Sequence, residues 1–353
     1  MNKQTDISSL GEFGLIKRIQ EIVNIHTGDP ALHNNLIKGV SDDTAVYRTS
    51  PGTVQLFTTD AFVEGVHFDL TYTSLKHLGW KSLVASISDI AAMGGIPRYA
   101  ACVLSLPKKI SAEMIDELYA GIVLACKQYK CMMVGGDTTG SLANMTVSIA
   151  LTGEAEEQKI LYRNGAKAGD YLCVSGHLGA SLAGLKILQR EKHRYEKSGN
   201  GTTFTPNIEP YTLALEKHLM PKPRLDISAI LTKDVTAHAM IDISDGLASE
   251  VHHLCNASDT GAEIYEHNLP LEAVTQNIAA ELGESATDYA LHGGEEYELL
   301  FAISEEEHAK LEPVTNDVTI IGRVTNKEKG IELVREQGER EALPFGGWDH
   351  FSK

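Results

Sequence analysis

Five segments of the chain carry aspartate beside serine, threonine or glycine, where a strand or a helix is expected to end. The aspartates are Asp42 with Asp43, Asp60, Asp89, Asp137, and the pair Asp242 and Asp245. One such aspartate usually forms a turn or caps a helix. Carboxylates and hydroxyls from several segments instead suit a hard cation such as Mg²⁺. Because the pattern occurs five times, the sequence favours a metal site that meets phosphate.

Residues 58–67 hold the richest set of these side chains. The apolar run at 54–57 predicts a strand, so we expect Asp60 at the end of that strand, with Gly65 and His67 close behind. An acid in this setting is poorly suited to a core. We therefore predict that Asp60 helps to bind a cation and phosphate.

Asp89 falls in the clearest predicted helix, over residues 74–93, which Gly94 and Gly95 are expected to end. It lies off the apolar stripe, on a face that it shares with Ser82 and Ser86. These small side chains leave room for an ion or a nucleotide, although an exposed aspartate on a helix is also common.

Asp137 follows a predicted strand at 132–134. The intervening Gly135 and Gly136 predict a glycine turn in which backbone amides approach a ligand closely. A plain glycine turn is the alternative. It is less attractive because an acid and two hydroxyls follow the glycines.

Asp242 and Asp245 lie between a predicted strand at 239–243 and a predicted helix at 247–254, so both carboxylates can face one site. Ser244 or Asp245 is alternatively the cap of that helix. The segment around Asp42 stays equally open, as either an Asx turn or a ligand.

Three other segments have two interpretations each. The turn at residues 176–179 can present a helix N-terminus to an anion, but it lacks the lysine of a phosphate-binding loop, which favours a packing turn. The charged residues 191–210 predict a surface insertion. Trp348 either plugs an edge of the core or stacks on an aromatic ligand.

Length and composition predict a soluble protein of two domains. The 353 residues are long for one core, and a polar connector at 153–165 divides them into predicted domains 1–155 and 156–353. No apolar run reaches the ~18–20 residues of a membrane span, so we expect no membrane association. The polar first ten residues contain no secretory signal, and a short amphipathic helix is expected over 11–25. These features predict a cytoplasmic protein.

The charge and the cysteines exclude other classes. A net charge of −17 argues against nucleic acid, whose phosphates need lysine and arginine, but not against a small phosphorylated molecule bound through cations. The five cysteines have no CxxC spacing. They are expected to be buried thiols rather than disulfides or zinc ligands.

The order of these motifs resembles the thiamine-monophosphate kinase family, within the aminoimidazole ribonucleotide synthetase superfamily. The run from Val63 to Phe68 and Trp348 select this family among its relatives. The matching segments are Ser41–Ala45, Thr59–Phe68, Ser88–Gly94, Gly135–Thr139, Asp242–Leu247 and Gly293–Glu295, with Trp348.

The resemblance implies an α/β fold (α+β type) with two domains: an N-terminal mixed sheet with helices, and a C-terminal α/β domain. It implies a homodimer formed largely by N-terminal strands, with several Mg²⁺ ions and ATP as co-substrate. The implied reaction is direct in-line transfer of the ATP γ-phosphoryl group to thiamine monophosphate. No catalytic side chain is implied, because a phosphate oxygen needs no general base.

The resemblance also assigns residues to three roles. The implied magnesium positions are Asp42, Thr58, Thr59, Asp60, Asp89, Asp137, Asp242 and Asp245. The implied nucleotide contacts are Gly136, Asp137, Arg163 and Ser244, and the implied thiamine-phosphate contacts are His67, Glu295 and Trp348. One departure is Glu296, where the family usually has aspartate, and we expect the longer side chain to shift the charge outward.

Other members of the superfamily fit less well. A selenophosphate synthetase would need a reactive cysteine near the N-terminus, whereas the first cysteine is Cys102. The hydrogenase-maturation relative would need a C-terminal cysteine. The synthetase that closes the imidazole ring stays possible, as does a catalytically silent protein that binds magnesium and nucleotide.

Overall fold

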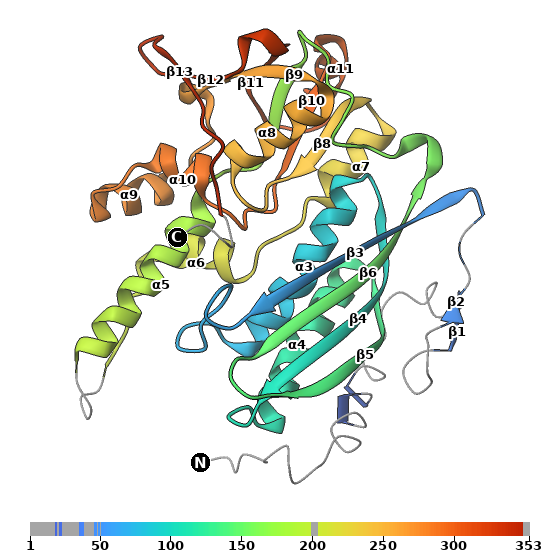
Figure 1. The fold of residues 1–353 in the computed structure, drawn as a ribbon, viewed down its shortest axis with the longest axis vertical. Helices are drawn as coiled ribbons and strands as arrows, with labels where there is room; N and C mark the ends of the chain where they lie inside the picture. Colours follow the sequence, from blue (N-terminus) through green and yellow to red (C-terminus); the bar gives the residue numbers. More distant parts are fainter. Residues whose placement is uncertain are drawn as a thin grey trace. The chain divides into compact units, whose positions relative to one another are not determined.

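The computed structural model describes residues 18–19, 21–22, 35–38, 46–47, 49, 51–198 and 204–348. The predicted acidic turn with Asp42, and most of the predicted helix over 11–25, lie outside these ranges. The chain forms two compact units (Figure 1). The N-terminal unit comprises Met1–Ile90 and Gly95–Gln158, and the C-terminal unit comprises Ala91–Gly94 and Lys159–Lys353.

The N-terminal unit contains a four-stranded mixed sheet and two long helices. The sheet has the order β3-β6-β4-β5, in which only β4 and β5 pair in parallel. The elements described in the N-terminal unit are β1 (Leu36–Lys38), β2 (Val46–Tyr47), β3 (Thr53–Val63), α3 (Leu75–Ala92), β4 (Ile96–Pro107), α4 (Ala112–Tyr129), β5 (Met132–Ser141), β6 (Thr146–Glu156) and the short η1 (Glu157–Lys159). Both helices lie on one side of the sheet (Figure 1).

Two glycines allow α3 and α4 to pack in close contact. A Cβ atom added at Gly79 would lie 1.9 Å from the Leu118 carbonyl oxygen, and one at Gly121 would lie 1.9 Å from that of Lys76. Any side chain would therefore force the helices apart. Ser111 caps α4, because its hydroxyl accepts a hydrogen bond from the Met114 amide. Helix α3 ends at a tight turn in which the Gly95 amide donates to the Ile90 carbonyl.

Two strands are longer than predicted, which changes the position of two predicted ligands. The strand expected at 54–57 continues to Val63, because β3 pairs with β6 along its whole length, and Asp60 therefore lies within the strand. The strand expected at 132–134 continues to Ser141, paired with β4, so the predicted glycine turn before Asp137 is wrong. At Gly136 the strands approach so closely that a Cβ atom would lie 2.0 Å from the Cys102 carbonyl oxygen.

The C-terminal unit is built on a seven-stranded sheet of order β13-β12-β9-β11-β7-β10-β8, in which only β12 and β9 pair in parallel. Its strands are β7 (Tyr171–Ser175), β8 (Ala237–Asp242), β9 (Thr260–Tyr265), β10 (Leu299–Ile303), β11 (Val318–Asn326), β12 (Ile331–Val334) and β13 (Arg340–Ala342). Its helices are α5 (Ala180–Lys197), α6 (Thr212–Leu219), α7 (Leu225–Lys233), α8 (Leu247–Ser258), α9 (Ala273–Leu282), α10 (Ala286–His292) and α11 (Glu305–Leu311), with short turns η2 (Glu209–Tyr211), η3 (Glu266–Asn268) and η4 (Lys327–Lys329).

Helices cover both faces of this sheet, and alternate strand residues enter two separate cores. Val174, Ile241 and Leu300 pack with residues of α8 and α10 on one face. Cys173, Phe301 and other alternate residues pack with α7 and α11 on the other face. The central strands are apolar throughout because both faces are buried.

The predicted surface insertion at 191–210 is partly wrong, because α5 extends to Lys197. Glu191 is buried, and its carboxylate accepts hydrogen bonds from Arg194 and from the Asn207 amide. This ion-paired anchor fixes the last turns of the helix.

The buried-thiol prediction is confirmed: all five cysteines are buried and form no disulfide, and burial raises the pKa of Cys102 to about 12. Among the helices that the structure describes, none has the length and apolar content to cross a membrane.

Candidate functional site

In the N-terminal unit, hydrogen bonds from hydroxyl groups join β3 to α3 at three predicted metal positions, Thr58, Asp60 and Asp89. The Thr58 hydroxyl donates a hydrogen bond to the Asp89 carboxylate, and the Ser86 hydroxyl donates to Asp60 across 2.6 Å. Thr58 and Asp60 alternate along β3 so that both face α3, where Ser86 and Asp89 lie one turn apart. Ser86, on the small-residue face predicted for α3, therefore contacts Asp60, the predicted ligand on β3.

The two carboxylates of this cluster repel each other. Burial first, and then the negative charge of Asp89, raise the pKa of Asp60 from 3.8 to about 6, against the opposing effect of the Ser86 hydrogen bond. The donor set consists of carboxylate and hydroxyl oxygens, which is the chemistry that Mg²⁺ prefers. A bound divalent cation would remove the repulsion, so these residues fit the predicted metal.

Thr59 and Asp137 lie on the opposite face of the same sheet. The registers place Asp137 beside Val103, which pairs with Ser148, and all three are on the face that α3 and α4 leave uncovered. Thr59 alternates with Asp60 and so points to this face. The N-terminal unit thus brings together Asp60 and Asp89 but separates Asp137 from them.

His67 lies in a turn that directly follows β3. Its Nδ1 atom accepts a hydrogen bond from the Val63 amide at 3.1 Å, which leaves the proton of a neutral ring on Nε2. The turn is held by Glu64, whose carboxylate binds Lys109 and accepts from the Met145 amide at 2.9 Å. This arrangement fixes the orientation of the imidazole and places its proton on Nε2.

In the C-terminal unit, the loop from Asp242 to Gly246 connects β8 to α8. Asp242 is buried and ends the strand, opposite Leu299. The alternative in which Ser244 or Asp245 caps α8 is wrong, because Gly246 precedes the helix with φ 133° and no side-chain cap forms. The two aspartates are therefore not needed to cap the helix.

Backbone hydrogen bonds tie this loop to both predicted substrate segments. The Glu295 amide donates to the Ser244 carbonyl at 2.7 Å, and the Trp348 amide donates to the Asp245 carbonyl at 2.9 Å. These bonds bring together three segments of the chain that are far apart in the sequence. The structure thus collects Asp242, Ser244, Asp245, Glu295 and Trp348 around one loop.

The segment that carries Glu295 is strained. Glu295 has φ 61° and Tyr297 has φ 55°, in the left-handed region that side chains other than glycine rarely adopt. A second backbone bond, from the Tyr297 amide to the Ile243 carbonyl at 2.9 Å, helps to hold this conformation. Such strain is typical of functional sites, where surrounding contacts impose it.

Glu250 is an acid at this loop that the sequence analysis missed. It is buried in the first turn of α8, and its Oε1 atom accepts from the Asp245 amide at 3.1 Å. Its Oε2 atom has no hydrogen-bond partner within the described ranges. Burial and the charges of Asp245 and Asp242 raise the pKa of Glu250 to about 8. The only signal in the sequence was an acid five residues after Asp245.

Trp348 is 54% exposed, which favours the stacking alternative over a plug at an edge of the core. Arg163 is also exposed, and its charge helps to lower the pKa of His253 on α8, after the larger effect of burial.

Asp42, one of the predicted metal positions, lies outside the described residues. Within those residues, no three His, Cys, Asp or Glu side chains are arranged to hold a metal ion by themselves. Mg²⁺ commonly completes its shell with water and substrate phosphates, so the predicted metal positions stay predictions.

Comparison with known proteins identifies the family. The model of the AIR synthase related protein N-terminal domain matches residues 41–155, and that of the C-terminal domain matches residues 167–335. A thiamine-monophosphate kinase of Aquifex aeolicus (strain VF5) is 36% identical over 346 residues, which are 98% of this chain and 99% of that protein. The chain belongs to the thiamine-monophosphate kinase family.

Solved structures agree with this membership. A thiamine-monophosphate kinase from Stenotrophomonas maltophilia K279a has a TM-score of 0.76 at 28% identity, covering 92% of this chain and 96% of that chain. A structure described as AaThiL complexed with AMPPCP and TMP has a TM-score of 0.73 at 34% identity, covering 98% of each chain. The predicted fold class, two synthetase-like domains of mixed α/β structure, is confirmed.

Proposed function

We propose that the chain transfers the γ-phosphoryl group of ATP to thiamine monophosphate, giving thiamine diphosphate and ADP. The observation that carries this proposal is the 36% identity to a thiamine-monophosphate kinase along 98% of the chain. AaThiL supports the substrates, because AMPPCP is an ATP analogue and TMP is the expected acceptor. Among the superfamily members considered, the kinase is the one that these relatives favour.

The chemistry requires placement and charge neutralisation more than covalent catalysis. Both substrates are anions, and the chain has a net charge of −17, so the protein alone would repel them. Bound Mg²⁺ would supply the positive charge that draws the two phosphates together and stabilises the transferred group. We assign no side chain as nucleophile or general base.

The proposed magnesium positions are Asp42, Thr58, Thr59, Asp60, Asp89, Asp137, Asp242 and Asp245. Their support differs with the geometry. Asp60 with Asp89, and Asp242 with Asp245, each form a local group of acids that a cation would relieve. Thr59 and Asp137 have less support, because they point away from Asp60 on the same sheet.

The proposed nucleotide contacts are Gly136, Asp137, Arg163 and Ser244, and the proposed thiamine-phosphate contacts are His67, Glu295 and Trp348. His67 can donate a hydrogen bond from Nε2, which suits a phosphate oxygen. Trp348 presents an exposed indole that can stack on a flat or cationic ring. The backbone amide of Glu295 holds this residue near the loop that carries Asp242 and Asp245.

We also propose that the protein is a homodimer formed through the uncovered face of the N-terminal sheet. Phe57 is 70% exposed and Val103 is 42% exposed on this face. Exposed apolar strand residues are typical of interaction surfaces. Light scattering should give twice the chain mass, and Phe57→Glu should shift it toward the monomer; an unchanged mass would contradict this interface. A cytoplasmic location stays a prediction from the sequence.

One assay tests the proposed reaction. The full chain is incubated with ATP, MgCl₂ and thiamine monophosphate, and thiamine diphosphate and ADP are quantified by chromatography. Equal amounts of both products, formed much more slowly by an Asp242→Asn control, would support the proposal. Nucleotide binding without thiamine diphosphate would contradict it and favour the silent binding protein.

A further inference from the structure

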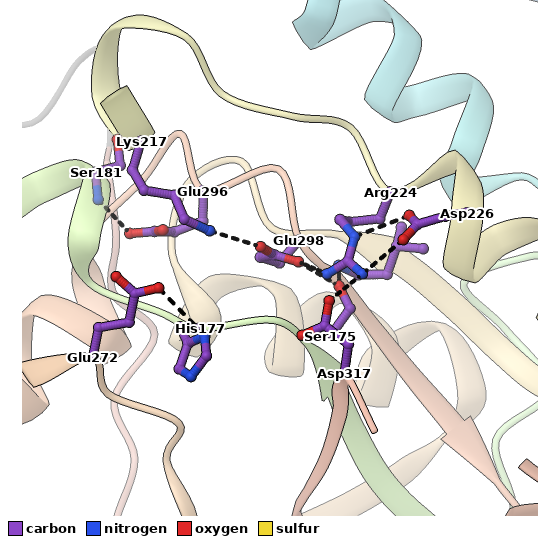
Figure 2. Close-up of polar contacts among 11 residues, drawn as sticks. Ser175, His177, Ser181, Lys217, Arg224, Asp226, Glu272, Glu296, Glu298 and Asp317 are labelled. Atoms are coloured by element: carbon purple, nitrogen blue, oxygen red, sulfur yellow. Dashed lines mark hydrogen bonds and ion pairs between the residues drawn. The ribbon is translucent and has the colours of Figure 1, made fainter. Parts of the chain in front are cut away.

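Glu296 directs its carboxyl group into the protein, toward the N-terminus of α5. The side chain is buried, and its Oε1 atom accepts a hydrogen bond from the Ser181 amide at 3.1 Å (Figure 2). The expectation that this side chain shifts charge outward is therefore wrong. The group that meets the helix N-terminus after the turn of residues 176–179 is the chain's own Glu296 carboxyl group, which accepts from one of the free amides there.

This contact anchors the strained segment that carries Glu295. Glu296 lies between the two residues with positive φ, Glu295 and Tyr297. The backbone bonds of these neighbours reach the loop after β8, whereas the side chain of Glu296 reaches α5. Glu296 thus joins the segment to a second, independent element.

His218 of α6 contacts both α5 and the segment that carries Glu295. Its Nδ1 atom lies 3.3 Å from the Ser181 hydroxyl and 3.6 Å from the Glu295 carboxylate. The ring is buried. The His218 ring therefore contacts both the Glu295 carboxylate and Ser181, the residue whose amide binds Glu296.

We propose that Glu296 is a positioning residue that fixes the Glu295 carboxylate for the thiamine-phosphate substrate by anchoring its segment to the N-terminus of α5. The inference rests on the proposed function, which gives Glu295 its substrate role. Glu296 itself is buried and acts through its neighbour. Its loss should affect the acceptor substrate and leave the affinity for ATP unchanged.

The charge of Glu296 gives the proposal a measurable signature. Burial raises its pKa from 4.5 to about 8, opposed by Lys217 and the Ser181 amide, and the carboxylate of Glu298 adds to the rise. Figure 2 shows Lys217 beside Glu296 and Glu298; its ammonium lies 3.3 Å from Glu298, which also binds Arg224 at 2.7 Å. His218 and Glu295 are also titratable groups nearby, as are His177 and Glu272, which Figure 2 shows near Glu296.

The direction of the expected pH effect follows from the raised pKa of Glu296. At pH 7 the Glu296 carboxyl is mostly neutral, and it ionises as the pH rises through about 8. An ionised carboxylate accepts a stronger hydrogen bond from the Ser181 amide. The anchoring should therefore strengthen with pH in the wild-type chain and stay constant in Glu296→Gln, which carries no charge at any pH.

The test measures KM for thiamine monophosphate and for ATP from pH 6.5 to 9 in wild type, Glu296→Gln and Glu296→Asp. At each pH, the KM of Glu296→Gln for thiamine monophosphate is divided by that of wild type. The titration of the substrate affects both values equally, so it does not change this ratio. We expect the ratio to rise to about tenfold at pH 9, with the KM for ATP unchanged. Glu296→Asp keeps an ionisable carboxyl and should lie nearer to wild type.

Glu306→Gln is the matched control, because Glu306 is an exposed glutamate on α11 that contacts Lys310. A ratio that stays at one across the pH range in a folded Gln variant would overturn the inference, as would equal changes in both KM values. If Glu296→Gln does not fold, Glu296→Asp decides: a raised KM for thiamine monophosphate with an unchanged KM for ATP would support the inference, and wild-type values of both would overturn it. A wild-type chain that forms no thiamine diphosphate would instead refute the proposed function.

Discussion

The two units hold their predicted ligands by different means. In the N-terminal unit, Thr58 and Ser86 hydroxyls bind the carboxylates of Asp89 and Asp60, on residues that alternate along a strand or recur along a helix. In the C-terminal unit, backbone bonds from Glu295 and Trp348 hold the loop that carries Asp245. The first arrangement depends on local geometry, and the second depends on contacts between distant segments.

This difference teaches where each unit is sensitive to mutation. A substitution in the N-terminal cluster changes a side-chain contact and leaves the strand and the helix in place. A substitution near Asp245 acts on a loop that three segments share, so its effect can reach both substrate-binding positions. The following predictions test this comparison, from the largest expected effect to the smallest.

Removing magnesium should affect both units together. We expect excess chelator to weaken ATP binding by more than about 100-fold, because the acids would then repel the polyphosphate without cations to bridge them. Isothermal titration calorimetry with and without MgCl₂ measures this. Tight binding of ATP in chelator would show that the acids of neither unit act through a metal.

Asp89→Asn and Asp242→Asn should each lower turnover by roughly 100-fold, since loss of a ligand charge removes about 3 kcal/mol of transition-state stabilisation. One variant lies in each unit, at nearly constant side-chain volume. Steady-state kinetics at limiting and saturating MgCl₂, with circular dichroism as a folding control, measure the effect. Near-normal turnover of both variants at limiting MgCl₂ would remove these residues from the set of ligands.

Trp348→Ala should raise the KM for thiamine monophosphate by about 5- to 30-fold, because it removes a stacking contact of about 1–2 kcal/mol. The KM for ATP should change little. Trp348 binds Asp245 through its backbone amide, which alanine retains, so the loop should keep its position. A lowered melting temperature with an unchanged acceptor KM would show that the ring is structural.

Asp60→Asn should stabilise the metal-free protein at pH 7.5. The pKa of Asp60 is about 6 in the folded chain and 3.8 in the unfolded reference, so its contribution to the free energy of unfolding is present below pH ~4 and lost as the pH rises through about 6. The charge penalty is at most about 3 kcal/mol. Asparagine removes it, which should raise the melting temperature by about 2–4 °C per kcal/mol.

Calorimetry of Asp60→Asn and wild type in chelator, at pH 4 and pH 7.5, checks this prediction. The difference in melting temperature should be much smaller at pH 4, where the aspartate is protonated in the folded chain and close to its own pKa of 3.8 in the unfolded chain. A lower melting temperature for the variant at both pH values would mean that the Ser86 hydrogen bond outweighs the charge penalty.

Local patterns in the sequence determined much of the fold. The apolar stripe predicted α3, and the pattern of residues 239–254 predicted β8 followed by α8. Apolar period and capping act within a few residues, so they can be read without the rest of the chain. Motif order also identified the family, because ligand types at fixed spacing are written directly in the sequence.

Strand ends and side-chain direction needed the tertiary structure. β3 and β5 continue past their predicted ends because β6 and β4 supply hydrogen-bond partners along their full length, and register then turns Asp137 away from Asp60. The inward direction of Glu296 was likewise decided by α5, whose free amides lie more than 100 residues earlier in the chain. A sequence specifies which residues carry charge, but the pairing of distant segments decides which of those charges meet.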